Sequence, residues 1–184
     1  MKQFILTTFF SLILMNGAVA RNYSAGTYKI DSESSKVGLE VTHLMISTAH
    51  GSFTHIDGII DLKENFEDSK VYVLIDFLDA ERNSQIEFIS TNISGTLASF
   101  NLTGLLTIKG VTQKVTFKSH YLGVVADGYG NDKAAFIGQT KIKRSDFGEE
   151  SDGDDEVKID LRILANRPNK ETASVFNEVQ EIIR

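Results

Sequence analysis

The sequence predicts an all-β fold, an antiparallel β-barrel of about eight strands. Between residues 28 and 163, short segments alternate apolar and polar residues with a period of two, which is typical of strands that bury one face. Glycine, asparagine and aspartate separate these segments at nearly even spacing. The chain contains one proline and no cysteine, so disulfides cannot hold the fold together. A sandwich of two sheets is the alternative architecture.

The clearest alternation lies at Val37, Leu39 and Val41, whose side chains share one face of a strand. Further strands are expected at residues 53–62, 71–75, 85–94, 97–108, 114–125, 133–143 and 156–164. Two details favour the closed barrel. Long antiparallel strands such as 97–108 would expose long edges in an open sheet and promote aggregation. Glycine also recurs within the strand patterns, as at Gly104, where it suits the bends of a coiled barrel wall.

Residues 1–20 have the pattern of a cleaved secretory signal peptide. Lys2 precedes an apolar stretch too short to span a bilayer as a helix, and Ala18-Val19-Ala20 matches the small-residue pattern that signal peptidases accept. We therefore expect an exported protein whose barrel domain covers residues 21–166, with an uncleaved anchor as the alternative. Because no later stretch approaches the length of a transmembrane helix, we expect no stable membrane insertion.

The last part of the chain, residues 167–184, changes character after Pro168. Its large apolar residues recur at helical spacing, and polar residues fill the opposite face. The apolar positions are Val175, Phe176, Val179, Ile182 and Ile183. We expect an amphipathic C-terminal helix that packs on the outside of the sheet. The alternative is a helix that binds a partner, such as a second copy of the chain in a homodimer.

Charge and motif content argue against several classes of function. The formal net charge is −6 and no run of Lys or Arg occurs, so nucleic acid is not an expected partner. His43 shares its strand face with Leu39 and Val41, and we expect it to point inward as a structural residue rather than a metal ligand. The sequence contains neither a Gly-x-Ser-x-Gly motif nor the spacing of a calcium loop. We therefore expect no catalytic residues, no metal and no cofactor.

Three blocks of sequence occur in the same order as in a known protein family. The first runs from Tyr28-Lys29-Ile30-Asp31 through Ser35-Lys36-Val37-Gly38-Leu39-Glu40-Val41-Thr42-His43 to Asp57-Gly58. The second is Gly104-Leu105-Leu106-Thr107-Ile108-Lys109-Gly110-Val111-Thr112-Gln113-Lys114-Val115, and the third is Arg144-Ser145-Asp146-Phe147-Gly148. Together they resemble the YceI-like family. The resemblance implies a lipocalin-like barrel in the bacterial periplasm that binds polyisoprenoids, including quinone-like lipids, in its cavity.

The sequence departs from the family pattern between the middle strands. The family has a helical segment there, whereas here Val71–Asp76 runs almost directly into Phe77-Leu78-Asp79. Most of that segment is therefore missing, which we expect to open one side of the cavity or to remove contacts with the ligand. The C-terminal helix extends beyond the usual end of the family, and we expect it to cover the gap.

The barrel and the resemblance together predict a protein that binds or transports a polyisoprenoid or similar long-chain lipid in its cavity, without catalysis. Ligand-contacting wall positions, chosen by strand parity, are expected at Val37, Leu39, Val41, His43, Phe53, Phe88, Leu106, Phe117 and Phe136. One alternative is a ligandless periplasmic stress or interaction protein whose barrel is filled by its own side chains. The other is an enzyme that acts on a small hydrophobic substrate.

If residues 1–20 are a signal peptide, the exported protein begins at Arg21. N-terminal sequencing of the protein recovered from the periplasm of a bacterial host measures this directly. The variant Ala20→Phe should accumulate as the uncleaved precursor, because signal peptidases require a small residue at that position. A wild-type protein that starts at Met1 or inside the apolar stretch would contradict the expected cleavage.

Overall fold

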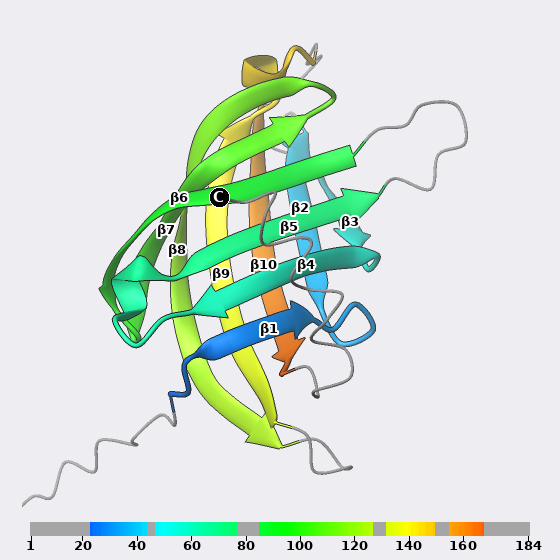
Figure 1. The fold of residues 1–184 in the computed structure, drawn as a ribbon. Helices are drawn as coiled ribbons and strands as arrows, with labels where there is room; N and C mark the ends of the chain where they lie inside the picture. The colour runs from blue at the N-terminus through cyan, green and yellow to red at the C-terminus, as the bar shows by residue number, and fades with distance from the viewer. Residues whose placement is uncertain (1–22, 44–46, 77–84, 127–131, 150–154, 168–184) are drawn as a thin grey trace, which may run out of the picture.

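The computed structural model describes residues 23–43, 47–76, 85–126, 132–149 and 155–167. The strands are β1 (Gly26–Ile30), β2 (Lys36–His43), β3 (Ser47–Phe53), β4 (Ile56–Leu62), β5 (Lys70–Asp76), β6 (Gln85–Thr96), β7 (Ser99–Ile108), β8 (Val111–Ala126), β9 (Asp132–Lys143) and β10 (Glu156–Asn166). Two short 3₁₀ helices, η1 (Phe66–Asp68) and η2 (Ser145–Phe147), follow β4 and β9. One antiparallel sheet contains all these strands in the order β1-β4-β5-β6-β7-β8-β9-β10-β2-β3, and pairing of β1 with β10 closes it into a barrel (Figure 1).

Several expectations concern residues outside the described ranges. The signal peptide, the C-terminal helix and the segment that follows Asp76 fall in residues 1–22, 168–184 and 77–84. They stay predictions. Within the described ranges, no helix is long and apolar enough to cross a membrane.

Two long strands are interrupted, so the ten strands fill eight positions in the barrel wall. β1 and β2 follow one another along the same edge of β10, where Lys29 opposes Asn166 and Lys36 opposes Arg162. β3 and β4 run back beside them, β3 paired with β2 and β4 paired with β1. The predicted antiparallel barrel of about eight strands is therefore confirmed.

The single strand expected at residues 53–62 was wrong, because two strands meet there. β3 ends at Phe53 and β4 begins at Ile56. Ser32, in the loop between β1 and β2, holds this break. Its hydroxyl donates to the carbonyl of Thr54 at 3.0 Å and accepts from the N–H of Ile56 at 3.0 Å. The alternation of apolar residues could not predict this break, because the break depends on hydrogen bonds from Ser32 in another loop.

Two bulges bend the barrel wall. The register shifts in β6 between Ser90 and Asn92, and in β8 between Tyr121 and Gly123. Gly123 has a φ of +109°, a conformation that residues with a side chain rarely adopt. Gly104 faces the first bulge, and a Cβ atom there would lie 2.4 Å from the ring of Phe88 and 2.5 Å from a backbone carbonyl. Gly123 thus supplies the backbone conformation of one bulge, and Gly104 allows close approach at the other.

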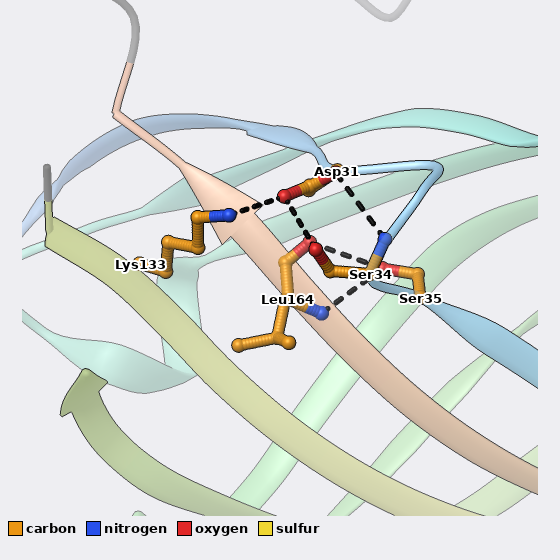
Figure 2. Close-up of polar contacts among 5 residues, drawn as sticks. All are labelled: Asp31, Ser34, Ser35, Lys133 and Leu164. Carbon is orange, nitrogen blue, oxygen red and sulfur yellow. Dashed lines mark hydrogen bonds and ion pairs between the residues drawn. The ribbon is translucent and has the colours of Figure 1, made fainter. Parts of the chain in front are cut away.

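A cluster of polar contacts closes the barrel between β1 and β2 (Figure 2). The hydroxyl of Ser35 donates to the carbonyl of Leu164 at 3.1 Å and accepts from the N–H of the same residue at 3.0 Å. The N–H of Asp31 donates to that carbonyl at 2.8 Å. Ser35 thus takes the place of the strand partner that Leu164 lacks at the interruption, and both backbone groups of Leu164 on this edge are satisfied.

The carboxylate of Asp31 adds a charged contact to this closure. Nζ of Lys133, on β9, lies 2.6 Å from its Oδ2 atom, and the hydroxyl of Ser34 donates to the same atom at 2.9 Å. Burial of Asp31 raises its pKa, but the hydrogen bonds from Lys133 and Ser34 together outweigh this and hold the pKa below its ordinary value. The ionised carboxylate therefore stabilises the folded protein.

We expect Asp31→Asn to lower the free energy of unfolding by about 1–3 kcal/mol at neutral pH, because the variant loses a charged hydrogen-bond acceptor with side-chain exposure of only 13%. The folded-state pKa lies below the unfolded value of about 3.9, so the stabilisation is present above that pH and is lost as pH falls through the folded-state pKa. Urea unfolding at neutral and acidic pH measures both effects.

The matched control is Glu156→Gln, which removes the ion pair of Glu156 with Lys141. Both of these side chains are more than half exposed, so we expect a loss below about 1 kcal/mol. If the difference between Asp31→Asn and wild type is the same at neutral pH and near pH 3, the closure does not depend on the charge of Asp31.

Candidate functional site

The interior of the barrel contains a cavity of about 410 Å³. Aliphatic and phenylalanine side chains make most of its wall. Among the described residues that line it, the polar or charged ones are Lys109, Ser119, Arg144 and Glu149. The volume lies within the range of small-molecule binding sites, about 300–1,000 Å³. The site can therefore take an apolar molecule, with charged groups near part of its boundary.

Eight of the nine wall positions predicted from strand parity line this cavity. They are Val37, Leu39, Val41, Phe53, Phe88, Leu106, Phe117 and Phe136. Side chains on one face of a strand alternate, and the barrel brings these faces together from β2, β3, β6, β7, β8 and β9. His43 ends β2 opposite Ser47, but its side chain lies outside the described part of the structure. Ligand contact at all nine positions stays a prediction.

One end of the barrel is sealed by aromatic rings and an arginine. Tyr28 and Tyr121 are fully buried there, and the ring of Tyr23 meets Tyr121 edge to face at 5.9 Å. The guanidinium of Arg167 lies 5.2 Å from the centroid of the Tyr28 ring and donates to the Tyr28 hydroxyl at 3.0 Å. It also donates to the carbonyl of Ala25 at 2.7 Å. Burial raises the pKa of Tyr121 to about 12, so this phenol stays neutral.

The opposite end of the barrel is less covered. The cavity-facing side chains of Leu39, Val41, Ile86, Ile108 and Ile142 are only half-buried there. β3 pairs with β2 on one side, and no described strand pairs with its other edge. Each of residues 47–52 in β3 is exposed. We therefore assign the open end of the cavity to this half of the barrel.

Two loops bring charged residues to the open end. Lys109, with a φ of +49°, and Gly110, with a φ of +82°, form the two-residue turn between β7 and β8. Arg144 and Glu149 lie in the loop that carries η2, and Nζ of Lys109 lies 2.5 Å from Oε1 of Glu149. The ring of Phe147, in the same loop, is buried in the core and lines the cavity beside them.

Hydrogen bonds fix the shape of the η2 loop. The N–H and the hydroxyl of Ser145 both donate to the carboxylate of Asp155, at 2.8 and 2.5 Å. These bonds lower the pKa of Asp155. Gly148 ends the helix in the left-handed conformation, with a φ of +76°. Gln113 on β8 donates to the carbonyl of Asp146 at 2.7 Å, which ties the loop to the barrel wall.

Strand parity did not predict the charged residues of the open end or the aromatic seal. Lys109 and Arg144 fall inside the second and third sequence blocks. Their place in these blocks was the one feature of the sequence that could have marked them as site residues. Glu149 comes directly after the third block. In the described part of the chain, no three His, Cys, Asp or Glu side chains form a group that could hold a metal ion.

A family model matches most of the chain in two segments. The family model described as YceI-like domain matches residues 28–77 and 74–165. The chain belongs to the YceI-like family. The two matched segments overlap at residues 74–77. The match covers the described barrel from β1 to β10, and the shortened segment after Asp76 stays a prediction.

Relatives cover most of the chain. A UPF0312 protein of Pseudomonas putida (strain W619) is 32% identical over 162 residues, which is 76% of this chain and 84% of the relative. Protein YceI of Escherichia coli O17:K52:H18 is 32% identical over 185 residues, 88% of this chain and 95% of the relative.

Solved structures share the fold. Burkholderia cenocepacia BcnA is 24% identical with a TM-score of 0.60, covering 74% of this chain and 99% of that chain. A Campylobacter jejuni YceI protein is 23% identical with a TM-score of 0.58, covering 70% of this chain and 91% of that chain. At these identities the similarity establishes the barrel fold.

We expect Arg167→Met to lower the free energy of unfolding by about 1–3 kcal/mol, because it removes the cation over the Tyr28 ring and the hydrogen bonds to the Ala25 carbonyl and the Tyr28 hydroxyl. Arg162→Met, which replaces an exposed arginine on β10, is the control and should change stability by less than about 0.5 kcal/mol. Thermal unfolding compares the two. Equal stability of both variants would mean that Arg167 does not hold the seal.

Proposed function

We propose that this protein binds a polyisoprenoid or similar long-chain lipid in its barrel cavity, without catalysis. The observation that carries the proposal is the cavity itself, which is apolar along its length, sealed at one end and bordered by charges at the other. An amphiphile has the complementary distribution of polarity. Membership of the YceI-like family supports the same assignment.

The driving force would be removal of the lipid chain from water. Each buried methylene group contributes roughly 0.8 kcal/mol. The cavity of about 410 Å³ lies within the range of sites that enclose small molecules, about 300–1,000 Å³. A short isoprenoid chain would be enclosed, whereas a longer one would extend out of the open end.

Two features support this proposal over the alternatives. A cavity of this volume argues against a barrel filled by its own side chains. The cavity wall offers charged groups only at Lys109, Arg144 and Glu149 among its described residues, and no histidine among these residues lines the cavity beside them. This distribution suits the orientation of a head group better than acid–base chemistry on an enclosed substrate.

We place this binding in the bacterial periplasm. The signal-like pattern of residues 1–20 supports export, and the similar proteins come from bacteria. The absence of cysteine is compatible with an oxidising compartment.

The proposal is tested by extracting the protein purified from the periplasm with organic solvent, identifying the extract by mass spectrometry, and titrating the delipidated protein with farnesol. We expect Leu106→Trp to weaken farnesol binding about tenfold or more, because the larger side chain enters the cavity. Leu105→Trp is the control, since Leu105 is 42% exposed on the outer face of the same strand.

Circular dichroism establishes that both variants fold, and Leu39→Trp at the half-buried open end replaces Leu106→Trp if that variant does not. Copurified lipid that is lost on blocking the cavity supports the proposal. A wild-type protein that carries no lipid and binds no farnesol, or a Leu106→Trp variant that binds as well as wild type, contradicts it.

A further inference from the structure

The charged residues at the open end come from two loops on the same side of the cavity. Figure 1 shows η2 and the turn between β7 and β8 at the same end of the barrel. Lys109, Arg144 and Glu149 all border the cavity, next to the apolar side chains of Ile108 and Phe147. Of the described cavity-lining residues, these supply two cations and one anion, so the border carries an excess of positive charge although the whole chain is acidic.

The backbone holds the two cations in place. Lys109 sits at the tip of a tight turn, at positive φ. The carbonyl of Arg144 accepts from the N–H groups of Phe147 at 3.0 Å and Glu149 at 3.2 Å, and its own N–H donates to the carbonyl of Asp155 at 2.9 Å. These contacts fix the backbone positions from which the two cationic side chains reach the border of the cavity.

The ion pair between Lys109 and Glu149 is exchangeable. The side chains of Lys109 and Glu149 are 46% and 34% exposed, and both lie at the border of the cavity rather than in the core. Ion pairs with this degree of exposure contribute little to stability. An incoming anion can therefore replace the carboxylate of Glu149 at low cost, provided that it restores a negative charge beside Lys109.

From this arrangement we infer that the preferred ligand carries an anionic head group, a carboxylate or a phosphate, which binds Lys109 and Arg144 and displaces Glu149 from Lys109. The inference rests on the proposed function, since the apolar chain must occupy the cavity to bring the head group to its border. Arginine binds carboxylate and phosphate oxygens through two parallel hydrogen bonds. A neutral hydroxyl or carbonyl does not replace the charge of Glu149, so such ligands bind more weakly.

The test compares farnesol, farnesoic acid and farnesyl phosphate, which share one apolar chain, by calorimetric titration of the delipidated protein. We expect at least one anionic ligand to bind about tenfold or more tightly than farnesol. Lys109→Met should reduce that ratio severalfold, Lys109→Arg should restore most of it, and Glu149→Gln should increase it. Lys114→Met, on the exposed face of β8, is the matched control and should leave the ratio unchanged. The preference should also decrease with added salt.

Each outcome separates this inference from the proposed function. Binding of none of the three ligands contradicts lipid binding itself. Equal binding of farnesol and both anions contradicts the anionic head group while lipid binding stands. A preference that Lys109→Met does not reduce, or that Glu149→Gln lowers, overturns the displacement of Glu149. Tighter binding of both anions assigns the preference to charge, and tighter binding of one alone identifies the head group as carboxylate or phosphate.

Discussion

The barrel depends on the seam along β10, where the first strand meets the last. A sheet has no free edges only when its outer strands pair with each other, and here one edge of β10 serves both β1 and β2. Between them the chain leaves the sheet. The hydroxyl of Ser35 and the N–H of Asp31 supply the hydrogen bonds that the missing residues would have made. These bonds keep the edge of β10 satisfied where β1 and β2 are interrupted.

The interior divides along the barrel axis into a packed part and a hollow part. Near the aromatic seal, aromatic rings pack edge to face, and the ring centroids of Phe66 and Phe100 lie 4.8 Å apart. Several side chains there are fully buried. Towards the open end, the inward residues of β2 are half-buried. The looser packing at the open end leaves an unfilled volume that dense packing would otherwise remove.

The sequence predicted what depends on local pattern. Alternation along each strand determines which residues share a face, so parity placed Leu106, Phe117 and their neighbours inside the barrel. The break between Phe53 and Ile56 could not be predicted, because it depends on Ser32 in a different loop. The Ser35–Leu164 bonds join residues 129 positions apart. Likewise, the turn at Lys109 and the loop at Glu149 meet only after the barrel has closed.

The aromatic seal has a consequence for traffic through the cavity. Tyr28 and Tyr121 are buried at one end, with Arg167 over the Tyr28 ring, so the cavity opens at the other end alone. A lipid bound as proposed would enter with its apolar end first and leave by the same opening with its polar end first. Two ligands could not pass one another in such a cavity, so a bound ligand would have to leave before the next one enters. If the proposed lipid is passed between two partners, both partners would have to meet the same open end of the barrel in turn.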